Sequence, residues 1–241
     1  MNLTPVLRAE ALKVLTLRSL CGTLLALFVV TTAFSALAGS SDASDPDFDP
    51  LFTALSGVMP GQIAAIAFGA VVISSEYQTN GIRLSLAAVP QRGRWFAAKL
   101  AVIAVPVLVV GLVTALAALL AARAGLGTAA DGLTAGEQVR GVVGCGIYLM
   151  LMALFAAGLT TLFRSGVATL STLIPFILVV SFVLGDAAGT AAGFLPDQAG
   201  QIVLYRTHDG TLGPWTGLAV AALWAAVALL AGFWRLRRRD A

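Results

Sequence analysis

The chain has 241 residues, of which 59% are hydrophobic and only 11% are charged, and its mean hydropathy is +0.92. A soluble domain carries about 25% charged residues because its surface must face water, so this composition excludes a soluble globule and indicates a membrane protein. The net charge of +3 does not indicate nucleic-acid binding, because the Lys and Arg residues lie at the ends of apolar runs rather than on one soluble face.

The two cysteines, Cys21 and Cys145, both lie inside apolar runs. There they are expected to be small packing residues rather than partners in a disulfide or ligands of a metal.

Residues 3–18 predict a helix that lies in the membrane interface. Pro5 suits a first helical turn after Thr4, and apolar residues recur at helical spacing among charged ones that include Glu10 and Lys13. Such a helix rests on the bilayer surface before the chain enters the membrane. The alternative is a frayed tail whose charges only set the topology, since short isolated helices are marginal.

Six apolar stretches are long enough to cross a bilayer core, which needs roughly 20 residues of helix. They are residues 20–38, 52–74, 100–122, 141–163, 167–184 and 215–234. No repeat, low-complexity tract or linker divides the chain, so residues 1–241 are expected to form one all-α membrane domain. Pro60, Pro106 and Pro175 lie within the stretches and offer positions for kinks.

The first stretch has an alternative interpretation as a cleaved signal segment, because Ala36-Leu37-Ala38 is a small-x-small pattern after an apolar run. The long leader and the nearly full span length favour a retained first helix.

The distribution of basic residues predicts the orientation. With the amino terminus in the cytoplasm, twelve of the fifteen Lys and Arg residues lie on the inner side, and only Arg123, Arg140 and Arg206 lie outside. Because cytoplasmic loops are enriched in Lys and Arg, both termini are expected in the cytoplasm of a cell whose inner membrane holds the protein. Residues 75–99 then form an inner loop and residues 185–214 an outer segment.

The stretches contain no Asp, Glu, Lys, Arg or His away from their ends. A transporter driven by protons or sodium normally has such a group, so the energy for a transport cycle is expected to come from elsewhere. Motifs for hydrolytic catalysis and the phosphate-binding G-x-x-x-x-G-K-[ST] loop are missing, and the single histidine, His208, lies in the outer segment. The chain is therefore expected to be neither an enzyme nor an ATPase, but a membrane component that works with a partner.

Polar side chains within the stretches are candidates for a substrate path, with hydrogen bonding between helices as the alternative. The candidates are Ser56, Gln62, Thr114, Thr160 and Ser171.

The inner loop contains the pattern of a short helix. Asn80 is placed to cap a helix that begins near Gly81, with Ile82, Leu86 and Val89 on one face. Pro90 ends that helix because it lacks an N–H donor. Glu76 is close enough to pair with Arg83 or with a basic residue beyond Pro90. An ordinary topology loop is the alternative, but it explains only the cations.

The loop as a whole resembles the first cytoplasmic loop of type-two ABC transporter permeases, which are exporter-type membrane subunits. The residues that carry this resemblance are Glu76, Tyr77, Asn80, Gly81, Arg83, Leu84, Leu86, Pro90, Arg92, Arg94 and Lys99. Ile82 departs from the Thr that often follows the glycine. Three further segments are similar to other parts of these permeases. They are RAEALKVLTLRS, which contains Glu10 and Lys13, FLPDQAGQIVL and WRLRRRDA.

The resemblance implies a half-transporter of an ATP-driven exporter, which pairs with a second permease, either another copy or a paralogue. Each permease would dock a separate ATP-binding subunit that holds ATP and Mg²⁺, so this chain itself would bind no cofactor. Coupling to that subunit is expected from Glu76, Tyr77, Gly81, Ile82, Arg83, Leu86, Pro90, Arg92 and Lys99. Short re-entrant helices would occupy the outer segment, and membrane lipids would surround the spans.

Lipidic, peptide or drug-like amphiphiles are the substrate classes that the resemblance implies. The alternative function is a membrane anchor or sensor subunit that binds the same ATPase and moves nothing.

Overall fold

The computed structural model describes residues 3–39, 48–78, 91–126, 132–180, 183, 189–207 and 210–238. In these ranges every regular element is a helix. Five helical segments are long and apolar enough to cross a membrane, namely Arg18–Ala38, Pro50–Gln78, Arg92–Leu126, Ala135–Phe163 and Pro214–Arg238. The composition thus predicted the class correctly: the protein is an all-α, multi-pass membrane protein.

The long helices are α1 (Leu3–Thr16), α2 (Arg18–Ala38), α4 (Val58–Gln78), α6 (Arg92–Leu126), α7 (Ala135–Phe163) and α11 (Pro214–Arg238). Shorter elements are α3 (Pro50–Leu55), α8 (Gly166–Pro175), the π-helix η2 (Phe176–Val180), the 3₁₀ helices η3 (Gly189–Phe194) and η4 (Ile202–Leu204), and α10 (Pro196–Gln201).

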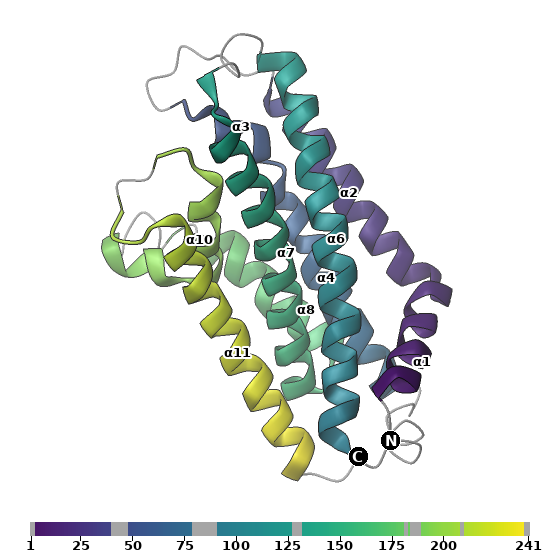
Figure 1. Cartoon of the computed structure of the whole chain (residues 1–241). Helices are drawn as coiled ribbons and strands as arrows, with labels where there is room; N and C mark the ends of the chain where they lie inside the picture. The colour runs from purple at the N-terminus through teal and green to yellow at the C-terminus, as the bar shows by residue number, and fades with distance from the viewer. Residues whose placement is uncertain are drawn as a thin grey trace.

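Helices α4 and α7 form the centre of the bundle. About two thirds of the apolar window of each is buried, against 22% for α2 and 33% for both α6 and α11. Away from their ends, these outer helices expose apolar side chains such as Leu25, Val109 and Leu223, as expected where lipid replaces water. Figure 1 shows α1 and the last turns of α11 at one end of the bundle and α3 at the other.

Glycines allow the closest helix contacts. A Cβ atom on Gly69 of α4 would lie 2.0 Å from the backbone oxygen of Ala153 on α7. Gly158 of α7 and Gly232 of α11 face each other in the same way, since a Cβ on Gly232 would lie 2.7 Å from the oxygen of Gly158. Small residues are enriched at membrane helix contacts because they let the backbones approach.

The second predicted stretch is interrupted. Helix α3 ends at Leu55 and α4 begins at Val58, with Ser56 and Gly57 between them. A Cβ on Gly57 would lie 2.0 Å from the backbone oxygen of Thr31 on α2, so the break lies where the backbones of these two segments touch. Pro60 belongs to the first turn of α4, where the missing N–H costs no helical hydrogen bond.

The fifth predicted stretch, residues 167–184, is not a continuous α-helix of spanning length. Its α-helical part ends at Pro175, and the π-helix η2 continues to Val180. Proline lacks the N–H that the α-helical pattern needs and crowds the preceding turn, which accounts for the change at this residue. By contrast, α6 continues through Pro106 and, with 35 residues, reaches about 52 Å.

Candidate functional site

Four charged side chains from three helices meet at the end of the bundle that holds α1. Glu10 and Lys13 lie on α1, Glu76 lies near the end of α4, and Lys99 lies at the start of the third turn of α6. Lys99 Nζ is 2.7 Å from Glu76 Oε1 and also pairs with Glu10, while Lys13 Nζ is 3.0 Å from Glu76 Oε1 and 3.1 Å from Glu10 Oε1. We call these four residues the charge cluster.

The charge cluster is mostly buried and electrically balanced. Glu10, Glu76 and Lys99 are only 3%, 5% and 2% exposed, whereas the side chain of Lys13 is 43% exposed. Burial by itself lowers the pKa of Lys13, but its hydrogen bonds and charge interactions with Glu76 and Glu10 outweigh burial and raise that pKa above 10.5. Two carboxylates and two ammonium groups therefore offset each other's desolvation, which buried charges need in order to be tolerated.

The start of α6 also attaches to the end of α11. Arg92 Nη1 donates to the backbone oxygens of Leu236, at 2.7 Å, and Arg237. Trp95 and Phe96 pack with Leu236, and the Phe96 ring stacks on Phe233 at a centroid distance of 5.5 Å. The residues that follow the loop 79–90 are thus held between α1, α4 and α11.

The coupling residues expected from the sequence divide into two groups. Glu76, Arg92 and Lys99 make the contacts described above, and Tyr77 is partly buried among the core residues, with a hydroxyl that has no hydrogen-bond partner among the described residues. Gly81, Ile82, Arg83, Leu86 and Pro90 lie outside the described residues, so the structure does not test the short helix expected there.

The residues expected to line a substrate path do not gather in one place. Ser56 donates to the oxygen of Thr53, and the buried Thr160 bonds to Ala156 and to Thr169 on α8. Thr114 is buried in α6, while Ser171 is exposed on α8. A path lined by these residues stays a prediction.

Gln62 belongs to a buried polar chain through the bundle. The Tyr148 hydroxyl of α7 donates to Gln62 Oε1 on α4, and Gln201 Nε2 at the end of α10 donates to the same hydroxyl at 3.2 Å. Gly200 makes this possible, since a Cβ there would lie 2.4 Å from the Tyr148 ring. The sequence reasoning missed Tyr148 and Gln201; polar side chains within an apolar context were the available signal.

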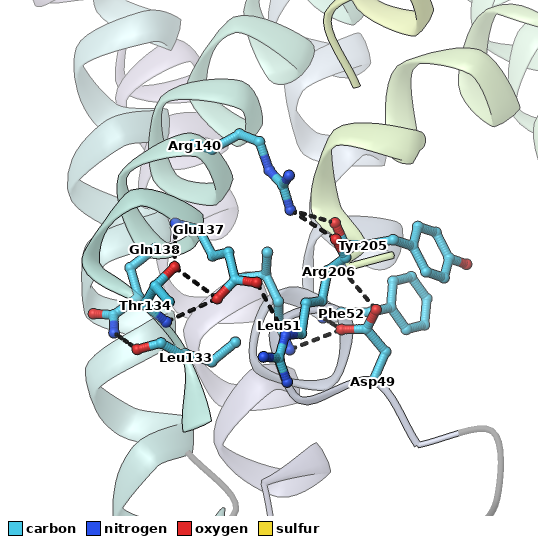
Figure 2. Close-up of polar contacts among 10 residues, drawn as sticks. All are labelled: Asp49, Leu51, Phe52, Leu133, Thr134, Glu137, Gln138, Arg140, Tyr205 and Arg206. Atoms are coloured by element: carbon cyan, nitrogen blue, oxygen red, sulfur yellow. Dashed lines mark hydrogen bonds and ion pairs between the residues drawn. The ribbon is translucent and has the colours of Figure 1, made fainter. Parts of the chain in front are cut away.

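A second cluster that the sequence reasoning missed lies at the opposite end of the bundle, where α3, α7 and the chain after η4 meet (Figure 2). Asp49 Oδ1 accepts hydrogen bonds from the backbone amides of Leu51 and Phe52 at the start of α3. Its Oδ2 accepts a hydrogen bond from the backbone amide of Arg206 at 2.7 Å. The Phe52 ring stacks on Tyr205 with a centroid distance of 4.3 Å.

Helix α7 provides the other side of this cluster. Thr134 and Glu137 form a capping box at its start. Glu137 Oε1 also accepts a hydrogen bond from Arg206 Nε at 3.0 Å. Arg140 Nη2 donates to the backbone oxygens of Tyr205, at 2.8 Å, and Arg206 (Figure 2). Thr-x-x-Glu and Asp-Pro are signals for helix starts that the sequence carries, but they do not reveal which distant residue they bind.

Comparison of the sequence with known protein families identifies the family of the chain. No curated protein gives a significant sequence match. Residues 6–187 match the family described as ABC-2 family transporter protein, and this range includes the charge cluster and both sides of the loop 79–90. With three quarters of its length matched and its apolar helices packed as a bundle, the chain belongs to the ABC-2 transporter family and is a membrane-spanning permease component.

Proposed function

We propose that this permease exports its substrate across the inner membrane, driven by ATP hydrolysis in a separate ATP-binding subunit that docks on the loop 79–90. The charge cluster is the observation that supports this proposal best. Glu76 and Lys99 lie on opposite sides of the loop. Glu76 is two residues before the end of α4, Lys99 is nine residues after Pro90, and both pair with residues of α1. A displacement of the loop would therefore move α1, α4 and α6 together.

The proposed topology has six crossings and both termini in the cytoplasm. Arg235 near the end of α11 binds the backbone oxygen of Leu162 near the end of α7, so both helices end on the same side. Gly217 at the start of α11 touches Ala199 of α10. The chain from Phe163 to Pro214 thus begins at one end of the bundle and finishes at the other, and α8 with η2 would start this crossing, the fifth in chain order.

A second permease completes the proposed transporter, either as an identical copy or as a paralogue. The five candidate substrate-path residues do not meet within one chain, as would be expected if the path lies between two permeases. ATP and Mg²⁺ would be bound by the partner ATPase. Lipidic, peptide and drug-like amphiphiles remain the candidate substrate classes.

The test is co-purification with an ATPase encoded beside this chain, followed by ATP hydrolysis and substrate flux in vesicles. We expect Arg83→Glu to weaken the complex, because it reverses a charge in the docking loop. We expect Glu76→Gln to leave the complex largely formed but to reduce stimulated hydrolysis, because it removes the ion pairs of Glu76 with Lys13 and Lys99 and leaves only Lys99–Glu10 to join this region to α1. If neither variant changed binding or hydrolysis, the proposed coupling would be wrong.

A matched control uses the four-residue swap Glu10→Lys, Lys13→Glu, Glu76→Lys and Lys99→Glu, which keeps all four pairs with inverted sign. Recovery of stimulated hydrolysis relative to Glu76→Gln would indicate that pairing, rather than one particular charge, carries the coupling. Stable binding of the ATPase without flux of any tested amphiphile would instead favour a non-transporting anchor or sensor subunit.

A further inference from the structure

An apolar groove lies where α1, α2 and α6 meet, next to the charge cluster along α1. Its cavity volume is about 380 Å³, and no polar surface lines it. The lining residues are Leu7, Ala11, Val14, Leu15, Cys21, Leu24, Ala101, Val102, Val105 and Pro106. A concave and wholly apolar surface of this kind suits a hydrocarbon chain.

The position of α1 sets the depth of this groove. Glu10 and Lys13 bind α1 to α4 and α6, while Leu7, Ala11 and Val14 on the same helix line the groove. Because the groove continues along only the first two turns of α2, to Leu24, it opens near the membrane surface rather than at the bilayer centre. An acyl chain entering it would keep its headgroup beside the junction of α1 and α2.

An exposed basic residue lies at that junction. Arg18 is the first residue of α2 and lies one helical turn before the lining residue Cys21, and the exposed Arg8 follows the lining residue Leu7 in the middle of α1. Helix α2 begins at Arg18 without a side-chain cap and without an acidic residue in its first turn. The start of α2 carries partial positive charge, but the end of α1 one residue earlier carries the opposite charge, so the guanidinium of Arg18 is the group that favours an anion here.

We propose that the groove binds one acyl chain of an anionic phospholipid whose phosphate lies against Arg18 and the start of α2. This site does not depend on the proposed export function, because it rests on the groove and its charged rim alone. A second copy of this chain would fit the rim less well, since it brings the same cationic side chains and no phosphate. The occupant would add apolar contacts to α1 beside those of the charge cluster.

The test is native mass spectrometry of the full-length chain in detergent, with phosphatidylglycerol and phosphatidylcholine of identical acyl chains added at equal concentration. We expect preferential retention of phosphatidylglycerol and a reduction of about fivefold in Arg18→Gln, since a basic side chain near an anionic lipid contributes roughly that factor. Arg123→Gln, at the far end of α6, is the matched control and should leave retention unchanged.

A second pair of variants tests the groove itself. Ala101→Phe fills it and should remove retention, while Ala117→Phe, 16 residues or about 24 Å further along α6, should not. If Ala101→Phe does not fold, as judged by size-exclusion chromatography, Ala11→Phe fills the groove from the opposite wall. Equal retention of both lipids that no variant changes would overturn the proposal.

Cys21 provides an independent measurement, because it is exposed in the groove while Cys145 is buried. Phosphatidylglycerol should slow the reaction of Cys21 with a maleimide, and phosphatidylcholine should slow it less. Protection that follows protein concentration instead of lipid concentration would show that a second copy covers the groove, and would also overturn the proposal.

Discussion

Lys99 near the start of α6 pairs at 2.7 Å with Glu76 near the end of α4, and both side chains are buried. The contact joins the end of α4 to the start of α6, and both are joined to α1, because Lys99 also binds Glu10 and Glu76 also binds Lys13. Its stability and its role in coupling can be measured separately.

Glu76→Gln is expected to destabilise the permease by about 3 kcal/mol. Removing one member of a buried pair leaves an uncompensated charge, at a cost of roughly 3–5 kcal/mol, and the remaining contact between Lys99 and Glu10 favours the lower value. The melting temperature in detergent measures this. Glu137→Gln, whose ion pair with Arg206 is partly exposed, should cost less than about 1 kcal/mol. Equal losses in both variants would contradict the importance of burial.

The pH dependence of the charge cluster follows from Lys13. Because the pKa of Lys13 is raised in the folded protein, its stabilising contribution is complete below pH 10.5 and is lost as the pH rises through the folded value. Lys13→Met should therefore melt below the wild type at pH 8, and the difference should shrink above pH 10.5. A difference that stayed constant through this range would argue against the pairing.

Tyr148→Phe is expected to disrupt the polar chain between α4, α7 and α10, since it leaves Gln62 and Gln201 without the hydroxyl that joins them. A double-mutant cycle with Gln201→Leu should give a coupling of about 0.6 kcal/mol, the average for hydrogen bonds between membrane helices, and no more than about 1.7 kcal/mol. Thermal unfolding of the four proteins supplies the data. Additive effects would show that the two groups do not interact.

Two glycine substitutions should have opposite effects. Gly69→Ala forces a Cβ to within 2.0 Å of the Ala153 oxygen and is expected to cost about 1–3 kcal/mol by overpacking. Gly22→Ala in α2 meets no atom within 4 Å and should stabilise by about 0.5–1 kcal/mol, because alanine loses less entropy in a helix. Melting temperatures that moved in the same direction for both would contradict the packing of α4 on α7.

Asp49→Ala is expected to loosen the cluster of Figure 2. The substitution removes the cap of α3, which is worth about 1 kcal/mol, and the acceptor of the Arg206 amide. Limited trypsin cleavage at Arg206 should become faster. Asp49→Asn keeps a capping oxygen and serves as the control, so identical cleavage rates in the two variants would assign the effect to charge rather than to the cap.

The hydropathy pattern was sufficient for the class and for most of the spans, because a bilayer requires long apolar helices. It was less reliable where a local contact overrides length. Gly57 against Thr31 divides the second stretch into α3 and α4, and Pro175 ends the α-helical part of the fifth. Both signals are present in the sequence, but the contact at Gly57 is made with a helix that lies elsewhere in the chain.

The sequence alone places Glu10 and Lys13 in the interfacial helix and Glu76 and Lys99 near the ends of apolar stretches, since charged side chains are expensive deeper in the membrane. Their meeting depends on the tertiary structure, because Lys13 pairs with a residue 63 positions away only when α1 packs against α4 and α6. The same holds for Arg206, which the sequence marked only as a basic residue outside the spans. Its contacts with Asp49 and Glu137 exist because the folded bundle brings three distant segments to one end.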